Sequence, residues 1–109
     1  MAIELVLLSD TAPTWQDWEA AITAVIPGGD LFALGDGAFL FRDNNNDGIL
    51  CWWPPRRLAA AREATGTFED ARAGQVWTDI ALPYVYPHIG RTICAELARQ
   101  LGGQVMERK

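Results

Sequence analysis

The sequence predicts an α+β fold, with a mostly antiparallel sheet around a central three-stranded meander and two to three helices packed chiefly on one face. Three observations predict this class. The chain opens with an apolar run, three more apolar segments alternate with turn-forming residues in 31–53, and two segments repeat apolar residues at helical spacing. The length of 109 residues is typical of one domain, so we expect residues 1–109 to form a single α+β unit.

The first expected element is a strand. Residues 3–8 form an apolar run that ends at Ser9-Asp10 and is interrupted only by Glu4. A run in which apolar and polar residues do not alternate indicates a strand that is buried on both faces. We therefore expect this strand to lie inside the sheet.

A helix follows the first strand. Thr14 is placed to cap the N-terminus of the helix, and Asp17 at the third helical position suits the helix dipole. Pro27-Gly28-Gly29 ends the helix. Its apolar stripe consists of Trp18, Ala21, Ile22 and Val25.

The three-stranded meander is expected over residues 31–53. Strands 31–35 and 38–42 flank Asp36-Gly37, the preferred pair for a two-residue type I′ turn in which both residues have positive φ. The polar loop 43–48 then leads into a third strand at 49–53. Pro54-Pro55 ends that strand because proline lacks the donor that the ladder needs.

The second half of the chain predicts a helix, a strand, a helix and a short strand. Residues 56–64 are helix-prone and contain three consecutive alanines, residues 67–74 read as loop, and 76–82 reads as a strand. Pro87 suits the first turn of a helix that Gly102-Gly103 ends in a left-handed cap. The apolar residues Ile89, Ile93, Leu97 and Leu101 repeat every four positions in this helix, and 104–107 predicts a final strand.

Charge and composition limit the function classes. The formal net charge is −5, which serves solubility and also favours association with a basic partner. Nucleic-acid binding is not expected, because it needs a basic surface. No stretch is long enough for a membrane span, and the N-terminus lacks the basic region of a secretory signal. The two cysteines have no metal or disulfide spacing, so we expect a reducing, cytoplasmic location.

The sharpest local motif is Asp43-Asn44-Asn45-Asn46-Asp47-Gly48, which matches the start of a calcium loop. The match fails at the twelfth position, where Pro54 replaces the bidentate Glu, and the flanking residues predict strands. A polar hairpin loop is the favoured interpretation, with a weak cation site as the alternative. We therefore expect no metal. We also expect no cofactor, because the glycines form no nucleotide-binding fingerprint.

Carboxylates and aromatic rings are the candidate partner-binding groups. Antiparallel topology places Asp30, Asp43 and Asp47 at one end of the meander and Asp36 at the other. Adjacent residues on a strand point to opposite faces, so one of Trp52 and Trp53 enters the core and the other covers the far face. Tyr84 and Tyr86 share a face if 82–86 is extended. The predicted partner-binding residues are Asp30, Asp43, Asp47, Trp52, Trp53, Tyr84 and Tyr86.

Three functional hypotheses follow. The first is a non-catalytic, acidic protein-binding module, of the inhibitor or immunity type, that occludes a basic enzyme or toxin surface. The second is a small-molecule- or metal-responsive domain that uses an aromatic pocket or the 43–48 loop. The third is a small enzyme that uses His88, hydrogen-bonded to Thr92, with Asp79 or Glu96.

Overall fold

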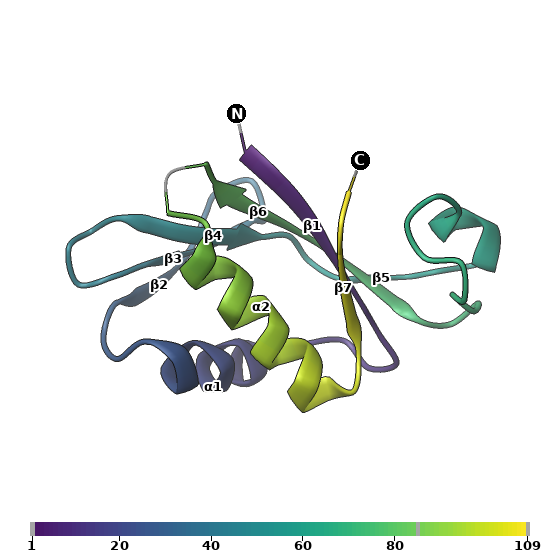
Figure 1. Ribbon diagram of the computed structural model, residues 1–109, viewed down its shortest axis with the longest axis horizontal. Coiled ribbons are helices and arrows are strands. Elements are labelled where there is room, and N and C mark those ends of the chain that lie inside the picture. Colours follow the sequence, from purple (N-terminus) through teal and green to yellow (C-terminus); the bar gives the residue numbers. More distant parts are fainter. Residues whose placement is uncertain (1, 85, 109) are drawn as a thin grey trace.

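The computed structural model describes residues 2–84 and 86–108, which form a seven-stranded antiparallel sheet with two helices on one face (Figure 1). This confirms the predicted α+β class. The strands are hydrogen-bonded in the order β2-β3-β4-β6-β1-β7, and β5 pairs with β6 beside this path. The elements are β1 (Ala2–Ser9), α1 (Trp15–Val25), β2 (Asp30–Ala33), β3 (Phe39–Arg42), β4 (Gly48–Trp52), β5 (Arg56–Arg57), the 3₁₀ helix η1 (Ala61–Ala64), β6 (Val76–Pro83), α2 (His88–Leu101) and β7 (Gln104–Glu107).

Strand β1 is the doubly buried strand that the sequence predicts. It pairs with β6 on one side and with β7 on the other, and its residues from Leu5 to Ser9 are all buried. Leu5 and Leu7 face the helices, whereas Val6 and Leu8 belong to a second cluster on the opposite face. The sheet is therefore covered on both sides at β1.

The helices begin and end where the sequence predicts. The Thr14 hydroxyl accepts a hydrogen bond from the Asp17 amide at 3.1 Å, and the Asp17 carboxylate accepts one from the Thr14 amide at 2.8 Å, which completes a capping box. Helix α2 starts directly after Pro87 and ends at Gly102, whose φ of 67° lies in the left-handed region.

Aromatic stacking fills the core under the helices. The rings of Trp18 on α1 and Trp52 on β4 stack with centroids 4.1 Å apart and an interplanar angle of 14°. Phe39 lies 5.7 Å from Trp52, and Trp15 meets Phe39 edge to face at the same distance. This row joins α1 to the meander, so the meander end of the sheet is held against α1.

The prediction of a helix at 56–64 is wrong. Arg56 and Arg57 instead form β5, which pairs with Trp77 and Val76 of β6. The Leu58 amide continues this pairing by donating to the Gln75 carbonyl at 2.8 Å, and the Leu58 side chain is buried. Burial of Leu58 and pairing with β6 outweigh the local helix propensity, which leaves only the single turn η1.

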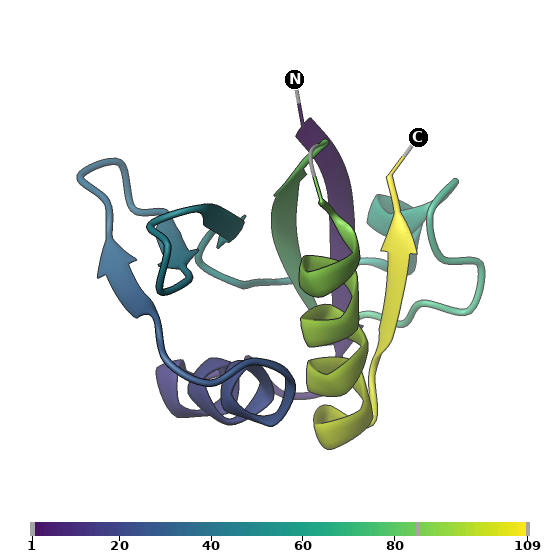
Figure 2. The same cartoon turned by 60° about the vertical axis from the view of Figure 1, so that its left-hand side comes forward.

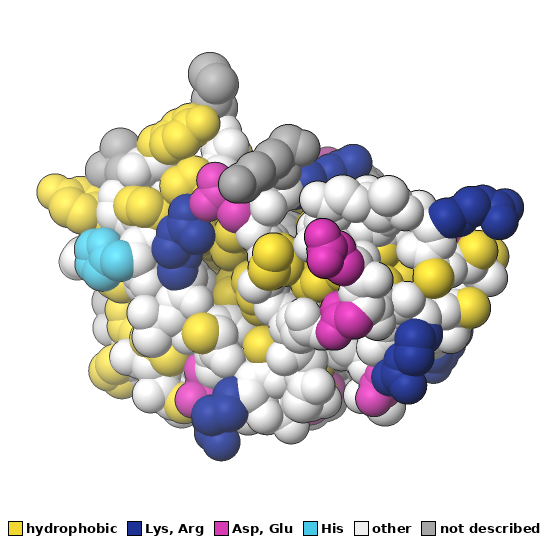
Figure 3. All heavy atoms as spheres, turned by 45° about the vertical axis from the view of Figure 1, so that its right-hand side comes forward, with side chains coloured by type: hydrophobic (Ala, Val, Ile, Leu, Met, Phe, Trp, Pro, Cys, Tyr) yellow, Lys and Arg dark blue, Asp and Glu magenta, His cyan; other side chains and the backbone are white. Residues whose placement is uncertain are grey.

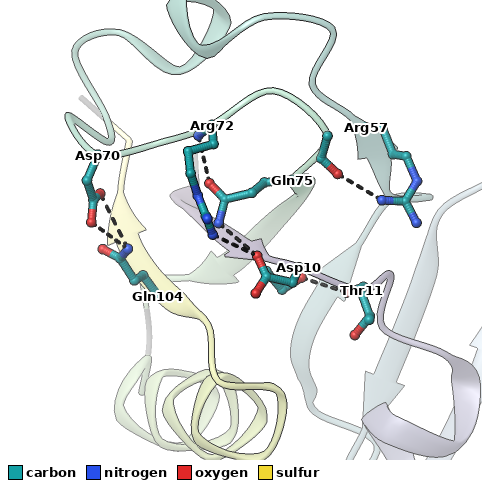
Figure 4. A network of polar contacts seen from close by, with 9 residues as sticks. Asp10, Thr11, Arg57, Asp70, Arg72, Gln75 and Gln104 are labelled. Atoms are coloured by element: carbon teal, nitrogen blue, oxygen red, sulfur yellow. Dashed lines mark hydrogen bonds and ion pairs between the residues drawn. The ribbon is translucent and has the colours of Figure 1, made fainter.

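The segment 58–75 covers the far face of the sheet at β1 and β6. Its apolar residues, together with Trp77, pack on Val6 and Leu8. Polar contacts fix it at its edges (Figure 4): Asp10 accepts hydrogen bonds from Arg72 and Gln75, and Asp70 accepts one from Gln104 of β7. The second cluster consists of Val6, Leu8, Leu58, Ala64, Phe68, Ala71 and Trp77.

The Asp36-Gly37 turn differs from the predicted two-residue type I′ form. The Leu34 amide donates to the Ala38 carbonyl and the Gly37 amide to the Leu34 carbonyl, which encloses a three-residue loop with positive φ at Gly37 alone. The 43–48 loop repeats this pattern, with Asn46 at φ 65°. Such loops combine a type I turn with one left-handed residue, so Asp36 does not need positive φ.

Trp52 and Trp53 lie on opposite faces, as predicted: Trp52 is 3% exposed in the core and Trp53 is half-buried on the far face. We expect Trp52→Ala to lower the free energy of unfolding by about 3–5 kcal/mol, because it removes a stacked ring and leaves a cavity. Trp53→Ala costs about 1 kcal/mol. Chemical denaturation measures both, and equal costs would contradict the assignment of faces.

Candidate functional site

A cleft of about 300 Å³ lies between the 43–48 loop and the start of α2. Its apolar part comes from Ile49, Pro83 and Ile89, whereas Asp43 and Asp47 provide carboxylates at one side. Tyr86 and His88 complete the lining, and their rings meet edge to face with centroids 6.3 Å apart. The cleft thus combines an apolar floor with negative charge and two exposed aromatic rings.

The loop side of the cleft is built from its own hydrogen bonds. One Asp43 carboxylate oxygen accepts from the amides of Asn45 at 2.9 Å and Asp47 at 3.0 Å. The Asn44 side chain accepts from the Gly29 amide at 2.8 Å, which ties the loop to the connection between α1 and β2. Asp43 therefore shapes the loop, whereas the exposed Asp47 carboxylate lines the cleft.

The helix side of the cleft depends on a close approach at Gly90. A Cβ atom at this position would lie 2.6 Å from the Leu82 side chain and 3.1 Å from the Ile49 carbonyl. Only glycine lets the start of α2 pack this near to β4 and β6. Tyr86 precedes the helix with φ 56°, a left-handed conformation that costs energy for a large side chain, and is 72% exposed.

The structure brings three predicted partner-binding residues together in this cleft: Asp43, Asp47 and Tyr86. Asp30 lies at the same end of the meander, opposite Arg42, and lines a separate groove between α1 and β2. Tyr84 is exposed and lies after the end of β6 at Pro83, and Tyr86 has a left-handed φ of 56°, so neither tyrosine belongs to the strand. The predicted extended segment 82–86 includes Val85, which lies outside the described residues.

The two tryptophans of the predicted set lie outside the cleft. Trp52 is buried in the core and is not available as a surface anchor, which corrects that prediction. Trp53 lines a hollow on the far face with Asp79 and Arg108. Sequence reasoning did not place His88 and Ile89 beside the 43–48 loop, because no local pattern indicates which loops meet in space.

The groups of the enzyme hypothesis do not form one site. Asp79 accepts a hydrogen bond from the Trp77 indole at 3.0 Å on the far face of the sheet. Glu96 lies eight residues after His88, about 12 Å along the helix, and hydrogen bonds from Arg99 lower the pKa of its carboxyl. The Thr92 hydroxyl donates to the His88 backbone carbonyl, not to the imidazole.

Neither thiol has the properties of a nucleophile. Burial raises the pKa of Cys94 in the core to about 12, although Arg91 acts in the opposite direction. Burial and the nearby Asp36 also raise the pKa of Cys51. Since the thiolate is the reactive form, these shifts lower the reactivity of both side chains near neutral pH.

Negative charge is concentrated in one part of the chain. Residues 12–53, which form α1 and β2 to β4, contain six acidic residues and one basic residue, whereas the remainder contains eight of each. All four ion pairs among the described residues connect groups of this remainder, for example Arg72 with Asp10 and Arg108 with Asp79. In Figure 3, basic and acidic side chains intermingle on the face that is turned forward. The residues of the acidic part are Asp17, Glu19, Asp30, Asp36, Asp43 and Asp47, with Arg42 as its only base.

Comparison with protein-family models, curated proteins and solved structures gives no match to this chain. No helix among the described residues is long and apolar enough to cross a membrane. Within residues 2–84 and 86–108, no three His, Cys, Asp or Glu side chains gather in a way that would hold a metal ion.

We predict that 1 mM calcium leaves the melting temperature unchanged within about 1 °C, because backbone amides already occupy an Asp43 oxygen and position twelve of the motif is Pro54. A micromolar site would add about 4 kcal/mol at this concentration and raise Tm by more than about 10 °C. Differential scanning calorimetry with and without calcium measures this shift. A rise of several degrees that Asp43→Ala abolishes would show a real cation site.

We predict that a thiol reagent modifies Cys94 only when the protein unfolds. Because the folded pKa is about 12 and the unfolded pKa is ordinary at 9.0, the unfolded chain binds fewer protons above pH 9, and the free energy of unfolding falls as the pH rises there. Labelling of a Cys51→Ser variant, followed by mass spectrometry, isolates Cys94. Rapid labelling of the folded variant at pH 8 would contradict the assignment.

Proposed function

We propose that this chain is a non-catalytic, acidic protein-binding module of the inhibitor or immunity type, which occludes a basic surface on an enzyme or toxin. The observation that carries the proposal is the placement of charge. The acidic residues of 12–53 make no ion pair among the described residues, so this end of the fold presents its negative charge to other molecules. Charge of this kind steers a basic partner and raises its association rate.

The cleft gives this charged end a place for one side chain of the partner. An arginine or lysine has a long aliphatic stem and a cationic head, and it suits an apolar floor with carboxylates at the rim. Ile49 and Ile89 would contact the stem, while Asp47 would receive the cation. Tyr86, which is 72% exposed, is the aromatic group that a partner would bury.

The location that fits this proposal is the reducing cytoplasm, where an immunity-type protein would meet its target. Two observations support a reducing compartment: both cysteines are free, and Cys94 is buried where it stabilises the core as a thiol.

One observation favours a second candidate function. The cleft volume of about 300 Å³ is at the lower end of the range for small-molecule sites, and its lining is largely apolar. A regulatory domain that binds a small ligand here is therefore the alternative. Ligand binding without any protein partner would decide in its favour.

The experiment begins with affinity capture of a partner at low salt, followed by measurement of binding kinetics with the purified pair. We expect Asp47→Lys combined with Asp43→Asn to slow association and flatten its dependence on salt, because the charges steer the encounter. Asparagine at 43 keeps the oxygen that holds the loop. Tyr86→Ala should speed dissociation, with a loss of about 2 kcal/mol of binding free energy if the ring is an anchor.

A matched control changes the charge of two acidic residues that lie outside residues 12–53. Glu4 and Glu69 are exposed and lie outside residues 12–53, so Glu4→Lys with Glu69→Lys should leave the association rate nearly unchanged. Circular dichroism checks that all variants fold. Equal rates for the two pairs of variants would place the interface elsewhere, and turnover of a small molecule by the purified protein would overturn the proposal.

A further inference from the structure

Strand β2 is an open edge of the sheet. It pairs only with β3, and in Figure 2 it is the outermost described strand on its side of the molecule, with no other described element beyond it. The opposite edge, β7, is tethered by side-chain contacts: Gln104 donates to Asp70 of the 58–75 segment, and Glu107 pairs with Arg91 of α2. Among the described residues, β2 has no such hydrogen bond or ion pair along its outer edge.

The hydrogen-bond pattern shows which groups β2 presents outward. The Leu34 amide donates to the Ala38 carbonyl of the β3 side, and the register continues with Phe32 opposite Leu40. Since bonding alternates along an antiparallel strand, Phe32 bonds to β3, whereas the amides and carbonyls of Leu31 and Ala33 point away from the sheet. These outward groups match those that an added strand uses.

Protective features that blunt edge strands are few in β2. Its sequence, Asp-Leu-Phe-Ala, contains no lysine and no proline, and the register with β3 has no bulge. Its shortness and Asp30 are the only features that discourage pairing. Ala33 is exposed, and both Phe32 and Leu34 are 39% exposed on the far face, so an incoming strand would meet apolar side chains there.

The other side of β2 borders a groove against α1. This groove has a volume of about 300 Å³, and Glu19 and Thr23 of α1 line it together with Leu31 of β2. Side chains of an added strand opposite Leu31 and Ala33 would point to this side, toward Glu19. Side chains opposite Phe32 and Leu34 would point to the far face.

The negative charge around β2 favours a basic occupant of this edge. Glu19, Asp30 and Asp36 surround β2, and the only basic residue of the acidic part, Arg42, lies 5.1 Å above the Phe32 ring. Pairing β2 with β2 of a second copy would place two acidic ends against each other, which opposes association. A basic strand would neutralise the same charges.

We infer that β2 accepts an extended basic segment of a partner protein as an added antiparallel or parallel strand, with basic side chains directed to the Glu19 groove and apolar side chains beside Phe32 and Leu34. This inference rests on the proposed function, because it names how the basic partner is held. Main-chain hydrogen bonds to Leu31 and Ala33 would supply affinity, and the alternation of basic and apolar side chains would supply specificity.

The test uses a blocked seven-residue peptide of alternating lysine and valine, with a control peptide of the same composition in block order. We expect the alternating peptide to slow hydrogen exchange of the Leu31 and Ala33 amides at saturation, measured by NMR, while the block peptide does not. Ala33→Pro removes an outward donor without breaking a bond to β3, and should weaken binding at least about tenfold relative to Ala33→Val.

Charge variants provide a second test that does not alter the backbone. Glu19→Lys should weaken binding of the alternating peptide several-fold, whereas Glu69→Lys, in the 58–75 segment, should not. Unchanged exchange at Leu31 and Ala33 during saturation, or equal affinities for Ala33→Pro and Ala33→Val, would overturn strand addition.

The outcomes separate this inference from the function on which it rests. Binding that perturbs Asp47 and Tyr86 but not β2 overturns strand addition and leaves the acidic binding module intact. If the affinity capture finds no basic partner and neither peptide binds, both proposals fail. A concentration-dependent dimer that Ala33→Pro abolishes would identify a second copy as the occupant and overturn the basic segment.

Discussion

The burial of β1 on both faces is the constraint on which the rest of the fold depends. Leu5 and Leu7 need the helices above them, and Val6 and Leu8 need a second layer below. The chain supplies that second layer with the segment 58–75, which covers β1 and β6 but does not extend over the meander. As a result, Phe32 and Trp53 remain partly exposed on the far face. The exposed part of the far face is thus a consequence of how the core is completed, whereas the open edge at β2 follows from the strand order.

The sequence predicted those features that depend on short-range pattern. Thr14 and Asp17 form the expected cap, Gly102 ends α2, and the alternation at Trp52 and Trp53 gives the two faces correctly, because each depends only on neighbouring residues. The helix expected at 56–64 failed because Leu58 is buried under β1 by a tertiary contact that no local propensity records. The Asp36-Gly37 turn failed because the Gly35 position extends the loop to three residues, which changes the turn type.

The candidate site was predictable in part for the same reason. Antiparallel connection alone places Asp30 at the end of the meander that carries the 43–48 loop. The sequence does not predict which residues lie across the cleft from that loop. Tyr86 and Ile89 lie there because Gly90 packs closely against Leu82 and the Ile49 carbonyl. The sequence shows a glycine in an otherwise regular helix pattern, but the reason for it appears only when β4 and α2 are seen together.

Two features beside the cleft add little to the stability of the folded state. The Asp47 carboxylate is exposed and forms no ion pair among the described residues. Tyr86 adopts a left-handed backbone conformation while its ring stays in solvent. Backbone strain and an unpaired charge that occur together beside the cleft are the observations that support the proposed binding function.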